Sequence, residues 1–139
     1  MPLGGQPDPS GGSKRVIRAP HLPPAVGPYS AGVVAGGFVF VAQGPISPMG
    51  EVVGSTVAEQ ARQTLHNIEL VLREAGCSRH DVVKVTVYLA DIEQYPALNG
   101  VYASFFERDF PSRIVIQAAR LPLGLLVEME AVAVLPGAG

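Results

Sequence analysis

The sequence predicts an α+β fold of two layers, in which two helices pack on one face of a mixed β-sheet. Short runs of β-branched and aromatic residues alternate with two longer segments of helical apolar spacing, in the order β-β-β-α-β-α-β-β. Because each of these helices has one apolar side, both must cover a sheet in order to bury it.

The first three strands precede the first helix. Residues 15–20 are predicted to form a short strand. Residues 30–35 and 38–44 are predicted to form a β-hairpin, because the turn pair Gly36-Gly37 separates them. A short extended segment over residues 51–54 follows them.

The first helix is the clearest element of the sequence. Thr56 precedes Glu59 by three positions, the spacing of a capping box, and Gly76 stands where a left-handed C-terminal cap belongs. Apolar residues recur at helical spacing between them: Val57, Ala61, Leu65, Ile68, Leu72 and Ala75. The other faces are expected to carry Arg62, Asn67, Glu69 and Arg73.

A strand, a helix and two strands follow. Residues 81–90 favour a central strand, because they are mostly apolar and β-branched. Asp91 is expected to cap the second helix, with Pro96 in its first turn. Residues 113–119 and 126–134 are the last two strands. The buried side of the second helix is expected to comprise Leu98, Tyr102, Phe105 and Phe106.

The 139 residues fit a single domain over residues 15–135. Residues 1–14 are rich in Gly, Pro and Ser and are expected to be a flexible tail, with a second tail at residues 136–139. Hydrophobic residues make up 47% of the chain and charged residues only 16%. A small domain this poor in charge is expected to hide part of its surface against partner subunits.

Composition and motifs disfavour several classes of function. The net charge of −2 gives no basic face for nucleic acid. Neither a secretory signal nor an apolar run long enough to cross a bilayer is found, and with the single cysteine, Cys77, this leads us to expect a cytoplasmic protein. The histidines are scattered, and no phosphate-binding glycine motif occurs, so neither a metal site nor a nucleotide site is expected.

An arginine at the start of an apolar strand is the feature that calls for explanation. Alternation puts Arg113 and Val115 on one face of the strand, and Ile114 on the other face, which is expected to pack on the helices. On the last strand Glu128 and Glu130 share the polar face. If these two strands pair as an antiparallel hairpin, Arg113 and Glu128 could lie near each other on the side away from the helices.

Two interpretations of Arg113 are equally favoured by its position alone. Its planar guanidinium suits a bidentate bond to a carboxylate or phosphate ligand. The alternative is a structural ion pair with Glu128, Glu130 or an acid of a partner chain. The other candidates also have structural alternatives, since Tyr29 could be a loop aromatic packed at an edge and Asn99 a helix-surface residue.

Four blocks of sequence together resemble those of a known family: "VGPYSAGVVAGGFVFVAQGPISPMGEVV", "QTLHNIELVLREAGCSRHDVVKVTVYLADI", "YPALNGVYASFF" and "FPSRIVIQAARLPLGLLVEMEAVA". The family they resemble is the Rid family, the RidA/YjgF group of reactive intermediate deaminases once called L-PSP ribonucleases. The likeness extends from about Val16 to Val134. The resemblance implies a chorismate-mutase-like fold and a homotrimer, whose sheets line a central barrel and whose clefts lie between adjacent subunits.

The resemblance also implies a reaction and a site. Active members hydrolyse enamines and imines, such as 2-aminoacrylate or 2-iminobutanoate, to 2-keto acids and ammonia without a cofactor. The carboxylate-binding arginine matches Arg113, and the glutamate that holds the water matches Glu128. The implied substrate-binding positions are Tyr29, Gln43, Gly44, Asn99, Arg113 and Val115.

Two positions depart from the family pattern. Val115 stands where many members have a cysteine, and Ala42 replaces the glycine of a Ser-Gly-Gln stretch. Both changes keep a second function open, namely binding of small carboxylates such as 2-keto acids without turnover. A ribonuclease, as the older family name suggests, is disfavoured by the acidic composition.

Overall fold

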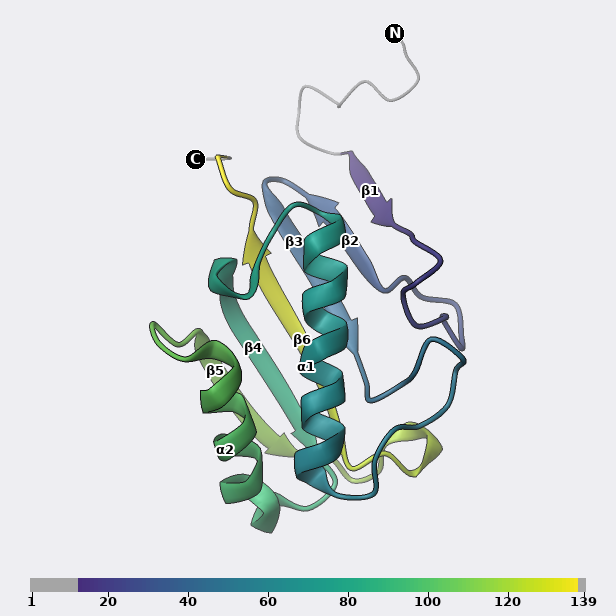
Figure 1. Cartoon of the computed structure of the whole chain (residues 1–139), viewed down its shortest axis with the longest axis vertical. Coiled ribbons are helices and arrows are strands. Elements are labelled where there is room, and N and C mark those ends of the chain that lie inside the picture. Colours follow the sequence, from purple (N-terminus) through teal and green to yellow (C-terminus); the bar gives the residue numbers. More distant parts are fainter. Residues whose placement is uncertain (1–12, 138–139) are drawn as a thin grey trace, which may run out of the picture.

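The computed structural model describes residues 13–137 and has the predicted two-layer α+β architecture, with the predicted order of strands and helices (Figure 1). Residues 1–12 of the predicted N-terminal tail and 138–139 of the C-terminal tail lie outside the described residues. The strands are β1 (Lys14–Ile17), β2 (Gly32–Ala35), β3 (Phe38–Gln43), β4 (Val82–Leu89), β5 (Ser112–Gln117) and β6 (Val127–Val134), and the α-helices are α1 (Val57–Glu74) and α2 (Tyr95–Phe106).

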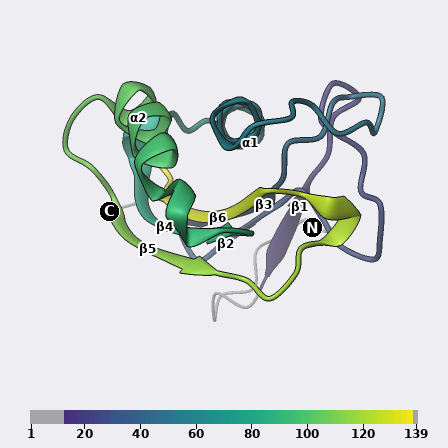
Figure 2. The same cartoon turned by 90° about the horizontal axis from the view of Figure 1, so that it is seen from below.

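The six strands form one mixed sheet in the order β1-β2-β3-β6-β4-β5. Strands β4 and β5 are parallel, and every other neighbouring pair is antiparallel. The last strand, β6, is therefore inserted between β3 and β4. Both α-helices lie on one face of this sheet (Figure 2), and the main hydrophobic core fills the space between the two layers.

Helix α1 begins and ends as its sequence predicts. The Thr56 side chain accepts a hydrogen bond from Glu59 N at 3.2 Å, while Glu59 Oε1 accepts one from Thr56 N at 3.2 Å, so both halves of the capping box form. The chain leaves the helix through Gly76, whose φ of +84° is a left-handed conformation that favours glycine. The apolar face of α1 packs on the sheet and includes the fully buried Leu65, Ile68 and Leu72.

Helix α2 starts slightly later than its cap predicts. Asp91 Oδ1 accepts a hydrogen bond from Glu93 N at 3.0 Å, but this cap serves a 3₁₀ turn over Ile92–Gln94. The α-helix follows directly, with Pro96 in its first turn. Three of the four residues predicted for its inner side are buried, and Phe105 is half-buried.

The pairing of β5 with β6 as a hairpin is wrong, because β4 lies between them. Strand β4, helix α2 and strand β5 form a crossover unit, and such a unit joins parallel neighbours. The segment after β5 then crosses to the other edge of β4, where β6 pairs antiparallel. Arg113 and Glu128 are thus not cross-strand neighbours.

The predicted faces of β5 are reversed. Arg113 pairs with Val85 and Val115 with Val87, and both partners are fully buried on the helix side. Ile114, which was expected to pack on the helices, is 58% exposed on the opposite side. The prediction failed because it assigned the apolar Ile114 and Ile116 to the core. For β6 the prediction from alternation is confirmed, because Glu128 and Glu130 face away from the helices.

Two polar residues of α1 are buried, although the sequence placed them on outer faces. Asn67 is 1% exposed and Glu69 is 9% exposed. Arg79 donates two hydrogen bonds of 2.7 Å to the Glu69 carboxylate and one of 2.7 Å to the Phe105 carbonyl, which joins α1 to α2. The hydrogen bonds from Arg79 hold the pKa of Glu69 below its ordinary value. The Glu69 carboxylate is therefore bound by Arg79 in a bidentate ion pair instead of by water.

The sheet face away from the helices is not covered by any described element (Figure 2). Large apolar side chains are exposed on it at both sides, with Phe38 and Phe40 on β3 and Ile114 and Ile116 on β5. A polar stripe that includes Lys84 and Glu130 separates them. No helix among residues 13–137 is long and apolar enough to span a membrane.

Candidate active site

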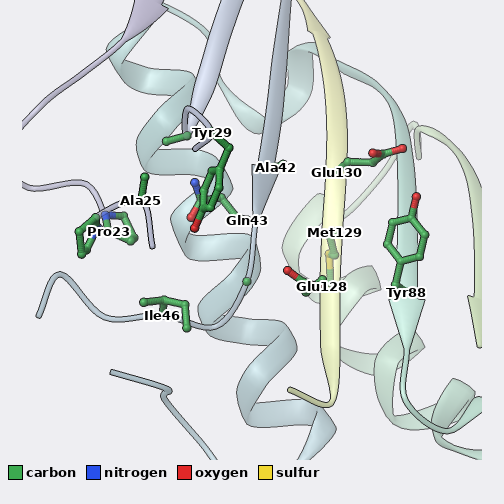
Figure 3. A pocket seen from close by; sticks show the side chains of 13 residues that line it. Pro23, Ala25, Tyr29, Ala42, Gln43, Ile46, Tyr88, Glu128, Met129 and Glu130 are labelled. Atoms are coloured by element: carbon green, nitrogen blue, oxygen red, sulfur yellow. The ribbon is translucent and has the colours of Figure 1, made fainter. Parts of the chain in front are cut away.

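One cleft opens on the uncovered face, at the ends of β3 and β4 and the start of β6 (Figure 3). It has a volume of about 270 Å³ and is called the Glu128 cleft here. Four of the sequence-predicted residues line it, namely Tyr29, Gln43, Gly44 and Glu128, together with Ala42. The structure therefore brings together residues that are up to 99 positions apart, from Tyr29 to Glu128. Its remaining lining residues are Pro23, Pro24, Ala25, Ala31, Ile46, Tyr88, Met129 and Glu130.

Gly44 lies directly against the Glu128 side chain. A Cβ atom added at Gly44 would lie 3.7 Å from Glu128 Cγ, 3.8 Å from Glu128 Oε2 and only 3.3 Å from Leu125 Cδ1. A larger residue would thus press on Leu125 and fill the space beside the carboxylate. Glycine at this position keeps the carboxylate accessible from the cleft.

Burial raises the pKa of the Glu128 carboxyl, because partial removal from water disfavours the charged form. Figure 3 shows the Glu130 side chain extending toward Tyr88, while the Glu128 carboxylate turns toward the end of β3. Burial and the carboxylates of Glu130 and Glu128 raise the pKa of Tyr88. The cleft therefore combines a carboxyl of raised proton affinity with phenol and amide groups, a set able to hold and transfer protons.

The raised pKa predicts an effect of the Glu128→Gln substitution that depends on pH. The folded state binds this proton more tightly than the unfolded state, so ionisation of Glu128 costs stability as pH rises through the folded pKa. We expect Glu128→Gln to raise the free energy of unfolding at pH 7 and to change it little at pH 4. Urea unfolding at the two pH values measures this. An equal change at both would contradict the raised pKa.

A second cleft lies on the helix side of the sheet, between α2 and the segment that leads into β5. It has a volume of about 310 Å³ and is lined by Asn99, Tyr102, Ala103, Phe110, Pro111 and Arg113. We call it the Arg113 cleft. It contains the remaining charged candidate, Arg113, and the helix asparagine, Asn99.

Two tyrosines of α2 hold the Arg113 guanidinium. Arg113 Nη2 donates a hydrogen bond of 3.0 Å to Tyr95 Oη, and its Cζ lies 4.5 Å from the centre of the Tyr102 ring. Among residues 13–137 no carboxylate lies within 4.0 Å of this guanidinium. The ion pair with Glu128 or Glu130 in the same chain, which the sequence left open, is therefore absent, and the charge remains available for another anion.

The hydroxyl of Tyr102 is buried without a hydrogen-bond partner among the described residues. Burial raises the pKa of Tyr102 to about 12, so the hydroxyl keeps its proton at neutral pH. Buried polar groups normally have partners. An unpaired phenol beside a cation that has no carboxylate partner makes the Arg113 cleft incomplete in the isolated chain.

The two clefts lie on opposite faces of the sheet. The predicted site residues therefore fall into two groups within one chain, Arg113 with Asn99 on the helix side and Glu128 with its neighbours on the other. Val115 is half-buried and packs against the core next to Val87. The sequence interpretation missed the contacts that Tyr95 and Tyr102 make with Arg113. The three-residue spacing of Asn99 and Tyr102 on one helix was the available signal.

Comparison with known proteins identifies the family of this chain. A model of the family described as Endoribonuclease L-PSP matches residues 19–135. The chain belongs to this family. The family is the Rid group that the sequence resembles, and the four blocks quoted above lie wholly within the matched residues.

Relatives in the L-PSP (Rid) family share most of their length with this chain. A RutC family protein of Pyrococcus abyssi is 44% identical over 87% of this chain and 97% of its own. A 2-iminobutanoate/2-iminopropanoate deaminase of Capra hircus is 42% identical over 87% and 90%, respectively. The crystal structure of Escherichia coli TdcF with bound serine superposes with a TM-score of 0.81 at 38% identity, covering 86% of this chain and 98% of that one. The fold is therefore that of the L-PSP family.

Proposed function

We propose that this protein hydrolyses 2-imino acids and their enamine tautomers to 2-keto acids and ammonia, in clefts between neighbouring copies of the chain. Arg113 and Glu128 lie on opposite faces of one sheet, so a single chain does not bring them together in one cleft. This observation carries the proposal that the cleft forms between two copies. Relatives named as 2-iminobutanoate/2-iminopropanoate deaminases support this class of reaction. Assembly of the site then requires Arg113 of one copy and Glu128 of the next.

The uncovered sheet face supports association. Phe38, Phe40, Ile114 and Ile116 are each at least 41% exposed on it, and exposed apolar side chains gathered on one face indicate an interaction surface. Because the two half-sites are different surfaces of the chain, the contact between copies is heterologous and must close into a ring. The homotrimer that the family resemblance implies is such a ring.

Arg113 would bind the substrate carboxylate. Among residues 13–137 its side chain makes one hydrogen bond, through Nη2, which leaves its other N–H groups to form charge-assisted bonds with a carboxylate. Tyr95 and Tyr102 restrict the guanidinium before the substrate arrives, which lowers the entropy lost on binding. The carboxylate of a small 2-imino acid held in this way directs its neighbouring imine carbon toward the second half-site.

Glu128 would deliver the water. Its carboxylate would accept a proton from the water as the oxygen bonds to the imine carbon, and the protonated carboxyl would return that proton to the imine nitrogen, which gives a neutral carbinolamine. The same carboxylate would then move the hydroxyl proton of the carbinolamine to its nitrogen as the C–N bond breaks, which releases ammonia and leaves the 2-keto acid. The raised pKa of Glu128 brings its proton affinity closer to neutral pH, which favours both transfers. The reaction needs no oxidant, and Tyr29, Gln43, Gly44 and Asn99 serve as binding groups around it.

The direct test is keto-acid formation from imines made in place by an amino acid oxidase. The wild-type protein should shorten the lifetime of imines from 2-aminobutanoate and alanine relative to buffer, measured by semicarbazide trapping. Tight binding of 2-keto acids by calorimetry, without acceleration of any imine, would instead establish the non-catalytic alternative that Val115 and Ala42 keep open.

The ribonuclease alternative is disfavoured by charge. Among the described residues lining the Glu128 cleft there are two carboxylates, of Glu128 and Glu130, and no lysine or arginine. A phosphate backbone requires basic contacts. Cleavage of RNA that survives removal of both Arg113 and Glu128 would point to a contaminating enzyme.

A further inference from the structure

A buried asparagine of α1 connects the core to the wall of the Glu128 cleft. Asn67 is 1% exposed. Its Nδ2 donates hydrogen bonds of 3.0 Å to the Gly44 carbonyl and 2.8 Å to the Ile46 carbonyl, and its Oδ1 accepts one of 2.9 Å from Gln63 Nε2. Both amide donors are thus used on one loop, which follows β3.

This loop also has backbone hydrogen bonds of its own. Ile46 N donates to the Gly44 carbonyl at 2.9 Å, and Val53 N donates to the Pro45 carbonyl at 2.8 Å beside the isolated bridge of Ile46 with Val52. Gly44 and Ile46 both line the Glu128 cleft, and the Gly44 backbone lies against Glu128. Among the described residues, the two bonds from Asn67 are the side-chain hydrogen bonds that tie this wall to α1.

We propose that Asn67 is a positioning residue that holds the Gly44–Ile46 wall against Glu128, and so fixes the carboxylate and the water it would hold. The catalytic part of this inference, an effect on the rate, rests on the proposed function. The structural part, an effect on the surroundings of Glu128, does not, since the wall controls how far the Glu128 carboxylate is removed from water. Asn67 is not among the residues that line the Glu128 cleft, so it would act through Gly44.

The other titratable groups near Glu128 are not the cause of its raised pKa. The titratable side chains that share its cleft are Glu130 on β6, Tyr88 on β4 and Tyr29 before β2. Burial alone accounts for the raised pKa of Glu128. A change that opens the wall and admits water should therefore bring that pKa back toward its ordinary value.

The test compares Asn67→Leu with Thr64→Val. Thr64 is fully buried on the same helix, and its hydroxyl donates a hydrogen bond of 2.8 Å to the Gln60 carbonyl, so Thr64→Val removes a buried hydrogen bond without touching the wall. The first readout is the pKa of Glu128 from ¹³C-carboxyl NMR, assigned with Glu128→Gln. We expect Asn67→Leu to lower this pKa by about half a pH unit or more, and Thr64→Val to leave it unchanged.

The second readout is keto-acid formation, for which we expect Asn67→Leu to lower kcat/KM by about 10- to 100-fold, with most of the loss in kcat. If Asn67→Leu does not fold, Gly44→Ala changes the same wall from the loop side and should also shift the pKa of Glu128. A folded Asn67→Leu variant with an unchanged Glu128 pKa would overturn the inference. An inactive wild type with the expected pKa shift would overturn the proposed function and leave the positioning role standing.

Discussion

The Arg113→Ala variant is expected to lose about 100-fold or more in kcat/KM for imine hydrolysis, because removing one partner of a hydrogen-bonded charge pair costs about 3 kcal/mol. Without the guanidinium the substrate loses both its carboxylate bonds and its orientation toward Glu128. The loss should appear with every imine tested, since all carry the same carboxylate. Keto-acid release with substrate imines made in place measures it.

Two further variants separate recognition from stability. Arg113→Lys keeps the charge but loses the planar fork and should retain an intermediate rate. Arg108→Ala removes an exposed arginine five residues earlier and should leave the rate unchanged. The free energy of unfolding should fall by only about 1 kcal/mol in Arg113→Ala, because among the described residues its guanidinium makes one hydrogen bond, to Tyr95, and a contact with the Tyr102 ring. A full rate in Arg113→Ala would refute the assigned role.

The second large effect is a recovery of activity from two inactive proteins. Arg113→Ala and Glu128→Gln should each have little activity alone, but oligomers that contain both chains should regain it. With random assembly from equal amounts, about a quarter of the clefts combine an intact Arg113 from one chain with an intact Glu128 from the next. We expect co-refolded mixtures to reach about that fraction of the wild-type rate.

The control mixture replaces Glu128→Gln with the double variant Arg113→Ala/Glu128→Gln. No cleft in that mixture has an intact arginine, so it should stay inactive. Chains with different tags and native mass spectrometry confirm that subunits have exchanged. Exchange without any recovery of activity would show that Arg113 and Glu128 do not act together across two chains.

Local signals predicted most of the fold. The capping box of Thr56 and Glu59, the left-handed Gly76 and the hairpin turn at Gly36-Gly37 each depend on a few neighbouring residues, and all are found in the structure. Alternation also assigned the faces of β6 correctly, since its apolar side is uninterrupted. The caps, turns and strand faces that depend on neighbouring residues alone could therefore be predicted from the sequence.

The errors concern long-range pairing. Whether β5 pairs with β6 or β4 is decided by the crossover through α2, which alternation within a strand does not reveal. The faces of β5 were reversed because Ile114 and Ile116 are apolar on an exposed face, where burial within one chain is the wrong criterion if another copy covers them. Asn67 was placed outside because polarity alone does not indicate a residue whose amide bonds a loop 21 and 23 positions away.

The insertion of β6 between β3 and β4 also affects how the protein is made. The strand that carries Glu128 leaves the ribosome after the other five described strands, yet it occupies an interior position of the sheet. Until it emerges, β3 and β4 have unpaired edges and an incomplete core, the condition in which nascent chains associate wrongly. Stalled or prematurely terminated chains that end before Val127 should therefore aggregate, while a complete chain closes its core and gains its carboxylate in one event.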